Sequence, residues 1–596
     1  MSDKNCKHII KYYGAINIFA GPNIEGVIDV YHCRRCKALF ADLRKIGIFL
    51  TLSSKIGFDE LEKDNEWLLL VCLKGDENKF NLVQGKIGSK ISTYWKDGKG
   101  TLAPNVPLER CMCPYNCGLC SNHISHTALA NIIVTNRCDL TCWYCFFYVK
   151  KGLEGAYVYE PSIEEIVEMV RMLRSERPVP GNSVQITGGE PTLREDLIDI
   201  IRAIKAEGID HIQLNTNGIN IALRGPEYAI ALRKAGVSNL YLSFDGVTPR
   251  TNPKNHWEIP YVLDACRKAN LGIVLVPTVI KSVNDHELGL IIRFAQRNMD
   301  IVRAVNFQPV SLTGRLTKTE REKYRITIPD CIHRIEEQTN GEITADDWFP
   351  VPSCTPLSDF IQFITRKPKY ELSIHFACGA GTYVFVDKES NKLVPITKFV
   401  DIKGLIEFLD EEIDEIKSGK PGALSVAKFL FKFNSFIDKS KEPKGLNFGK
   451  LITDIIVYNS YEAVGQLQLK SLFLGMMHFQ DKYNQDEERL QRCDIHYLTP
   501  DLRIIPFCSF NVIPEFYRDR IQQKYGIPVP EWEKSVGRKL EDGLYRGTLR
   551  RGKHHPNCGC DLAKQNGNGD NKADQLPGCA CSVIHSSKTG QAAISS

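Results

Sequence analysis

Three cysteines follow one apolar run in the stretch Val134-Thr-Asn-Arg-Cys138-Asp-Leu-Thr-Cys142-Trp-Tyr-Cys145-Phe. Their C-x3-C-x2-C spacing places three thiolates in one loop. Three thiolates on a four-iron cluster leave one iron open, whereas a site that only transfers electrons is normally closed by four cysteines. An open iron can chelate a small cofactor and pass an electron to it. The triplet alone leaves one alternative open, a zinc or electron-transfer site that a remote fourth ligand closes.

Outward from this loop, short apolar runs alternate with segments of helical period. Strands are expected at residues 132–135, 184–187, 212–215, 240–244, 273–279 and 304–308. Helices are expected at residues 163–174, 197–207, 228–235, 262–270 and 288–296. Strands separated by helices of this length form parallel βαβ units. The predicted fold class is therefore α/β, with a partial or full parallel (β/α) barrel.

Polar residues follow the later strands of this barrel, and active sites of such barrels gather at the carboxyl ends of the strands. The second strand ends in Thr187-Gly-Gly-Glu190-Pro191. The cysteine triplet followed by this turn resembles the radical S-adenosylmethionine (SAM) superfamily. The resemblance covers residues 131 to about 312, and it implies a barrel of the radical SAM type.

The resemblance also implies a role for each matching residue. Cys138, Cys142 and Cys145 would hold a 4Fe-4S cluster that cleaves SAM reductively to a 5′-deoxyadenosyl radical. Gly188 and Gly189 would let the backbone approach SAM closely, and Glu190 would accept its ammonium group. The other matching residues are Asn215, Asn217, Ser243 and Asp245 beside the ribose and carboxylate of SAM, and Tyr144 and Gln308 beside its adenine. Capping of its strand is an equal alternative for Gln308.

Two further cysteine groups lie on either side of the barrel. Cys113, Cys117 and Cys120 are close enough in sequence to surround one cluster. This spacing favours iron-sulfur over zinc, because zinc usually draws its ligands from two separated pairs. Cys111 is the nearest candidate for a fourth ligand, and a more remote residue is the alternative. Beyond the barrel, four separate cysteines are equally consistent with a third cluster and with simple burial of their thiols. They are Cys354, Cys378, Cys493 and Cys508.

The two ends of the chain also carry cysteines. Cys33-Arg-Arg-Cys36 forms one knuckle of a rubredoxin-like iron site or a zinc site, for which Cys6 and His8 are candidate partners. Near the carboxyl end, Cys558, Cys560, Cys579 and Cys581 lie in a segment rich in Gly, Asn, Ser and Lys. Such a composition predicts disorder, so specific and adventitious metal binding both remain open there.

The length of 596 residues exceeds what one hydrophobic core organises. We expect a small β-rich module with a metal site at residues 1–110, an auxiliary cluster loop at 111–130, the barrel at 131–328, a C-terminal auxiliary-cluster and helical substrate region at 329–553, and a flexible tail at 554–596. Residues 403–480 are expected to be mainly helical. Their apolar residues at helical spacing predict core packing, with a lipid-contacting surface as the alternative.

Composition narrows the class of protein. Apolar residues make up 43% and charged residues 25% of the chain, and the formal net charge is only +5, which does not argue for nucleic acid as a partner. No signal pattern and no apolar run of about 20 residues is visible, so we expect a cytoplasmic protein without a transmembrane span. The 21 cysteines cluster at short spacings, which favours metal ligation over disulfides.

A narrower resemblance rests on the string from Cys113 to His123, the triplet, and the stretch Ile505-Pro-Phe-Cys508. These are similar to the tetraether lipid synthases of archaea and their close relatives, a group once considered methylases of pterin-cofactor biosynthesis. The resemblance implies three 4Fe-4S clusters, a mononuclear iron or zinc, a reductant such as ferredoxin, and a membrane-surface lipid substrate. It implies carbon-carbon bond formation between terminal carbons of archaeol-type chains. The alternatives are a radical SAM methylase of a pterin-type cofactor and a peptide-modifying maturase.

Overall fold

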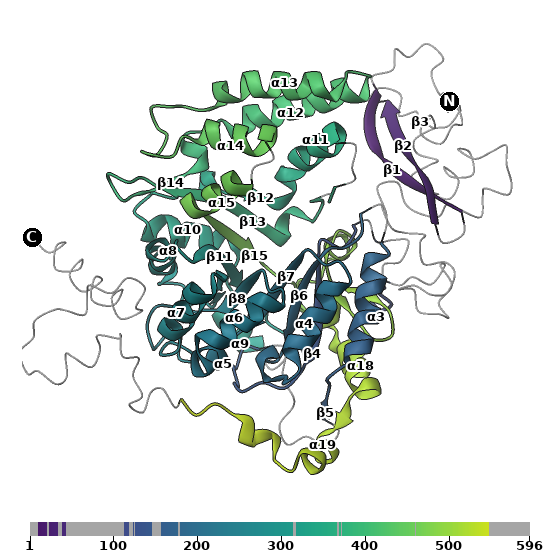
Figure 1. Ribbon diagram of the computed structural model, residues 1–596, viewed down its shortest axis with the longest axis vertical. Coiled ribbons are helices and arrows are strands. Elements are labelled where there is room, and N and C mark those ends of the chain that lie inside the picture. The colour runs from purple at the N-terminus through teal and green to yellow at the C-terminus, as the bar shows by residue number, and fades with distance from the viewer. Residues whose placement is uncertain are drawn as a thin grey trace, which may run out of the picture.

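The computed structural model describes residues 113–118, 123, 125–145, 156–176, 179–313, 318–365, 369–370, 372–458 and 461–547, together with the backbone of 10–20, 23–33 and 39–42. Within these residues, the central sheet has 13 strands, and helices pack along it (Figure 1). Its middle consists of six parallel strands in the order in which the sequence supplies them. The α/β class and the mainly parallel sheet that the sequence predicts are therefore confirmed.

The barrel elements begin and end close to the expected positions. The strands are β4 (Leu129–Thr135), β6 (Ser183–Gly188), β7 (His211–Thr216), β8 (Asn239–Ser243), β9 (Gly272–Val276) with β10 (Thr278–Val279), and β11 (Val302–Pro309). The helices are α3 (Ile163–Arg174), α4 (Leu197–Ala206), α5 (Ile219–Arg224), α6 (Pro226–Ala235), α7 (Ile259–Ala269) and α8 (Leu288–Arg297). Ser162 caps α3 by accepting from the backbone N–H of Glu165 at 3.2 Å, which explains why this helix begins where it does.

The two faces of the barrel strands differ in chemistry. The helix-covered face carries fully buried aliphatic residues such as Val184, Ile186 and Leu214. On the other face, amide side chains of neighbouring strands bond to one another: Gln185 donates to Asn131 at 2.7 Å, Gln213 donates to Gln185, and Asn239 donates to Gln213 at 3.2 Å. The inner wall of this partial barrel is thus polar, unlike the branched apolar interior of a closed eight-stranded barrel.

The C-terminal region extends both edges of the sheet. On one edge, β15 (Ser471–Met477) runs parallel to β11. The next strand outward, β13 (Gly379–Val386), pairs antiparallel with β15. On the other edge, β16 (Ile495–Leu498) runs parallel to β4, and β17 (Ile504–Pro506) follows antiparallel. The sequence assigns residues 471–477 to the helical stretch, and the structure differs there. This apolar run is buried on both faces, as a central strand requires.

The helical stretch itself forms a separate layer with its own core (Figure 1, top). It contains α12 (Ile402–Lys417), α13 (Gly422–Phe433), α14 (Phe448–Tyr458) and α15 (Tyr461–Lys470), joined by α11 (Thr355–Thr365). Core packing of the apolar stripe is confirmed for Phe429, Phe433 and Phe436, which are buried. Leu424, from the same stripe, is 57% exposed, and Phe431 is 91% exposed.

The remaining described elements connect or flank these layers. They are β12 (Phe349–Pro350), β14 (Leu393–Pro395), α9 (Lys318–Tyr324), α10 (Ile328–Gln338), α16 (Glu487–Gln491), α17 (Phe507–Val512), α18 (Arg518–Tyr525), β5 (Tyr157–Val158), β18 (Ile527–Pro528) and α19 (Val529–Val536). Near the amino end, β1 (Ile10–Ala20), β2 (Asn23–Cys33) and β3 (Leu39–Asp42) form an antiparallel sheet. The expected β-rich module at residues 1–110 extends beyond the described residues and stays a prediction. Among the described helices, none has the length and hydropathy to cross a membrane.

Candidate active site

The carboxyl ends of the barrel strands surround a cavity of about 250 Å³. Eleven residues that the sequence singles out line it, namely Cys138, Cys142, Tyr144, Cys145, Gly188, Gly189, Glu190, Asn215, Asn217, Ser243 and Gln308. They come from the cysteine loop and from the ends of β6, β7, β8 and β11. Parallel strands bring these distant segments together because all their carboxyl ends point to the same side of the sheet. Asp245 is the one predicted barrel residue that does not line the cavity.

The turn after β6 lies directly against the cysteine loop. The backbone N–H of Gly189 donates to the carbonyl of Thr135 at 2.8 Å, and that of Glu190 donates to the carbonyl of Arg137 at 2.8 Å. A Cβ at Gly188, where φ is +148°, would lie 2.0 Å from the Thr135 oxygen, and a Cβ at Gly189 would lie 2.1 Å from the Arg137 oxygen. In the structure both glycines allow close contact with the loop. The close approach to SAM that the sequence assigns to them stays a prediction.

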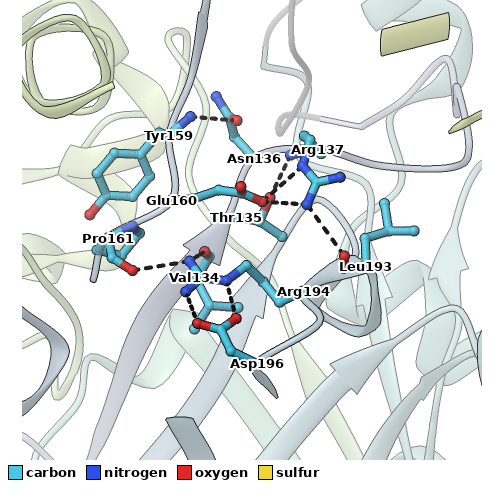
Figure 2. A network of polar contacts seen from close by, with 10 residues as sticks. All are labelled: Val134, Thr135, Asn136, Arg137, Tyr159, Glu160, Pro161, Leu193, Arg194 and Asp196. Carbon is cyan, nitrogen blue, oxygen red and sulfur yellow. Dashed lines mark hydrogen bonds and ion pairs between the residues drawn. The ribbon is translucent and has the colours of Figure 1, made fainter. Parts of the chain in front are cut away.

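A buried arginine fixes the strand end that precedes this loop (Figure 2). Arg194 donates to the carbonyl of Val134 at 2.9 Å and to that of Pro161 at 3.0 Å, and it forms an ion pair with Asp196 at 2.6 Å. One guanidinium therefore joins β4, the segment before α3 and the segment before α4. Such a multiply bonded arginine gives rigid support to the loop that begins at residue 136.

Three thiols of the loop line one side of the cavity. Burial raises the pKa of the Cys138 thiol well above its usual value, and the carboxylates of Asp139 and Glu190 raise it further. Burial also raises the pKa of Cys142, which the nearby Lys254 cation partly opposes. No fourth cysteine is among the described lining residues, so the donor set fits a three-thiolate cluster.

The described residues contain no group of three or more His, Cys, Asp or Glu side chains gathered closely enough to hold a metal ion. A single ion needs all its ligands within one coordination sphere. A cluster holds its cysteines further apart, because iron and sulfide atoms lie between them. The three thiols lie along one side of the cavity, and their assignment to a cluster stays a prediction.

Glu190 is buried and its carboxylate is strongly hydrogen-bonded. Its Oε1 accepts from the backbone N–H of Thr192 at 3.1 Å and from the hydroxyl of Thr216 at 2.8 Å, and its Oε2 accepts from the N–H of Asn217 at 2.8 Å. Burial, followed by the charge of Asp139, raises the pKa of Glu190 to about 7. A cation bound beside these two carboxylates would relieve their repulsion. The ammonium-binding role of Glu190 stays a prediction.

A lysine that the sequence reasoning missed closes the opposite side. Lys254 forms a buried ion pair with Asp245 at 2.6 Å, donates to Tyr144 Oη at 2.9 Å and also donates to Ser243 Oγ. The Tyr144 hydroxyl in turn donates to Asp245. Lys254 lies in a loop well beyond the end of β8, so no strand-end pattern could mark it. Asp245 therefore acts as its counter-ion behind the cavity wall.

The wall contributed by the C-terminal region is aromatic. Phe479, Tyr497 and Phe507 line the cavity. The ring centroids of Phe479 and Phe507 are 4.2 Å apart with 25° between the planes, those of Tyr497 and Phe507 are 5.1 Å apart, and Tyr497 stacks on Phe510 at 4.2 Å. These four rings form an aromatic column. Since Phe507 covers one face of Phe479, only its other face and its edge remain to line the cavity. Sequence reasoning noticed the Phe507-Cys508 stretch but not the column.

The first auxiliary group is partly described. The Cys117 thiol donates to Ser509 Oγ at 3.2 Å, and its backbone N–H donates to Tyr517 Oη at 2.8 Å. Cys113 packs against the same hydrophobic core as Cys117. Cys111 and Cys120 lie outside the described residues, so this ligand set stays a prediction.

The second auxiliary group is brought together in part. Burial raises the pKa of the partly buried Cys493 thiol, and the thiols of Cys508 and Cys378 raise it further, so the three lie near one another. Arg489 donates to Cys378 Sγ at 3.3 Å. Cys354 is exposed, at the end of a short turn that contacts the turn ending at Cys378. A cluster on these four cysteines stays a prediction.

The terminal metal sites involve cysteines near both ends of the chain. Cys6, Cys36 and the four cysteines between residues 558 and 581 lie outside the described residues. Cys33 is described only as the last backbone position of β2. The expected rubredoxin-like or zinc knuckle therefore stays a prediction.

The chain is similar to several known proteins. The model of the Radical SAM superfamily matches residues 132–295. A 7,8-dihydro-6-hydroxymethylpterin dimethyltransferase of Methanocaldococcus jannaschii is 45% identical over 503 residues, which are 80% of this chain and 97% of that protein. A GTP 3′,8-cyclase of Clostridium acetobutylicum is 31% identical over 208 residues, 34% of this chain and 61% of that protein. A radical SAM methyltransferase structure from Sphaerobacter thermophilus is 16% identical, with a TM-score of 0.25 over 36% of this chain and 62% of that chain.

These findings correct one expectation from the sequence. Coupling of isoprenoid lipid chains is contradicted, because the relative that matches over 97% of its own length is described as a pterin dimethyltransferase. The expected lipid substrate loses its support with it. The alternative that the sequence left open, a radical SAM methylase of a pterin-type cofactor, agrees with this relative.

Proposed function

We propose that this chain, which belongs to the radical SAM superfamily, is a radical SAM enzyme that methylates a pterin-type substrate. The observation that carries the proposal is the identity of 45% over almost the whole of the pterin dimethyltransferase from Methanocaldococcus jannaschii. The identity extends far beyond the shared superfamily segment at residues 132–295.

Membership of the superfamily implies a 4Fe-4S cluster and SAM. We assign the cluster to Cys138, Cys142 and Cys145, which line one side of the cavity. When bound, these cofactors supply the radical chemistry, and the protein supplies binding and orientation. The residues of the chain hold the loop against the turn at Gly189. They place the carboxylate of Glu190 and the cation of Lys254 on the cavity surface, with Asp245 behind Lys254.

The far side of the cavity supports a flat heterocyclic substrate. The aromatic column offers Phe479 as its end ring, and planar rings stack on such a surface with energy beyond simple burial. Polar side chains that line the same cavity, Gln185 and Tyr241, offer hydrogen-bonding groups to such a substrate. A pterin, which is planar and rich in donors and acceptors, uses both features.

The test is product analysis with purified protein. Anaerobically reconstituted enzyme, SAM and a strong reductant should convert a 7,8-dihydropterin into a product heavier by one or two methyl groups. One SAM per methylation is cleaved reductively to 5′-deoxyadenosine and methionine, and each methyl group comes from a second SAM, which is released as S-adenosylhomocysteine. The Cys142→Ala variant serves as the matched control, and it should form none of these products. SAM cleavage without methylation of any pterin offered would overturn the proposed substrate while leaving the superfamily chemistry intact.

A further inference from the structure

The last described part of the chain returns to the cysteine loop. After α18, the short strand β18 pairs antiparallel with β5, and the backbone N–H of Val529 donates to the carbonyl of Ala156 at 3.0 Å. In Figure 1 this yellow-green segment lies beside β5 and then passes along the bottom of the molecule through α19. Residues 527–545 are called the C-terminal strap below.

The strand that the strap pairs with is itself bonded to the base of the cysteine loop. Asn136 donates from its backbone N–H to the carbonyl of Tyr159 at 3.2 Å, and its side-chain oxygen accepts from the N–H of Tyr159 at 2.9 Å. Its amide nitrogen donates to the carbonyl of Tyr157 at 2.9 Å. Figure 2 shows Asn136 facing this segment, with Arg137 beside Glu160. The strap, β5 and the loop base therefore form three adjoining layers.

The strap also touches the residue directly before Cys138. The guanidinium of Arg137 lies 5.2 Å from the ring centroid of Trp532, whose side chain is buried. The same guanidinium is paired with Glu160 at 2.6 Å and donates to the carbonyl of Leu193 at 3.3 Å. Arg137 is thus fixed from several sides, and the strap supplies the aromatic one. A cation on an aromatic face gains most when water is excluded, as it is here.

A second contact reaches the residue directly after Cys138. The backbone N–H of Tyr545 donates to the carbonyl of Asp139 at 2.8 Å. The Tyr545 hydroxyl donates to the buried carboxylate of Glu258 at 2.5 Å, which anchors this end of the strap to the start of α7. The strap therefore contacts both neighbours of one cysteine, the side chain of Arg137 and the backbone of Asp139, from residues about 400 positions later in the chain.

We propose that the C-terminal strap is a positioning element for the cysteine loop and that Trp532 is its main positioning residue. Neither Trp532 nor Tyr545 lines the cavity, so the strap acts only through Arg137 and Asp139. Holding both neighbours of Cys138 limits how far its thiol can move relative to Cys142. Binding constellations depend on such support from residues outside the site.

The alternative is that Trp532 only adds general stability. Hydrogen exchange in the cluster-free full chain separates the two roles, because it needs no cofactor. In Trp532→Ala, the loss of the contact with Arg137 should make local opening of the cysteine loop about tenfold more frequent. Amides of residues 136–142 should therefore exchange about tenfold faster. Amides of β7 and β8 should keep their wild-type rates.

Matched variants complete the test. Trp532→Phe keeps an aromatic face and should restore most of the protection, whereas Trp532→Leu keeps apolar volume and should not. Val536→Ala, an exposed position on the same helix, should leave every rate unchanged. In reconstituted holoenzyme, Trp532→Leu should also change the electron paramagnetic resonance line shape of the reduced cluster. Unchanged exchange at residues 136–142, or equal acceleration in β7 and β8, would overturn the proposal. If Trp532→Ala does not fold, Trp532→Leu decides between these outcomes.

Discussion

Alanine at position 189 tests whether the turn after β6 serves the cysteine loop. A Cβ there would lie 2.1 Å from the carbonyl oxygen of Arg137 and 2.5 Å from its carbonyl carbon. Both atoms belong to the backbone, so no side-chain rotation can relieve the clash. The turn and the loop must therefore separate, and the two hydrogen bonds of Gly189 and Glu190 to the loop, each 2.8 Å long, are stretched or lost.

The expected cost follows from these two terms. Overpacking of a well-packed region costs about 1–3 kcal/mol. Loss of two buried backbone hydrogen bonds adds about 0.5–1.5 kcal/mol each. The free energy of unfolding should thus fall by roughly 2–6 kcal/mol, a large part of the 5–15 kcal/mol typical of a folded protein. SAM affinity should fall as well, because the loop and the turn both line the cavity.

Urea unfolding of cluster-free Gly189→Ala against wild type measures this cost. Gly465→Ala is the matched control, since nothing lies within 4 Å of a Cβ at that helical position. It should leave stability unchanged or raise it by about 0.4–1 kcal/mol. If Gly189→Ala lowers the free energy of unfolding by less than about 1 kcal/mol, and so behaves like the control, the assignment of this glycine to the loop contact is refuted.

Three further outcomes are expected. Burial raises the pKa of the Glu176 carboxyl from its usual value of 4.5 to about 8 in the folded chain. Between these two pKa values the folded chain binds more protons than the unfolded chain, so stability falls as pH rises from 4.5 to about 8. Glu176→Gln should remove about 4 kcal/mol of that fall between about pH 5 and pH 8, as denaturation at both pH values would show. Lys254→Met leaves Asp245 buried without its cation and should cost about 3–5 kcal/mol, whereas the double variant with Asp245→Asn should recover much of the loss; additive effects in this cycle would contradict the ion pair. Phe429→Ala should cost about 3–5 kcal/mol, and Phe431→Ala, on the exposed side of the same helix, less than about 0.5 kcal/mol, so equal midpoints in thermal unfolding would contradict the packing of α13.

Much of the barrel could be predicted because its signals are local. Alternating apolar runs and helical periods depend on neighbours a few residues apart, and α3 begins and ends where its period predicts. The strand β15 escaped this reasoning, since a short apolar run beside helices has no period that separates strand from helix. Residues 471–477 form a strand because they pair with β11, which lies far away in sequence.

The candidate site divides in the same way. Sequence alone determined the thiols at Cys138, Cys142 and Cys145 and the turn at Gly189, because short spacings encode them directly. Only the tertiary structure decided that Lys254 neutralises Asp245, that four rings form a column on the far wall, and that Trp532 lies on Arg137. These contacts join residues that no spacing relates. They arise when parallel strands bring their ends to one edge and the chain folds back across them, which is a property of the whole fold.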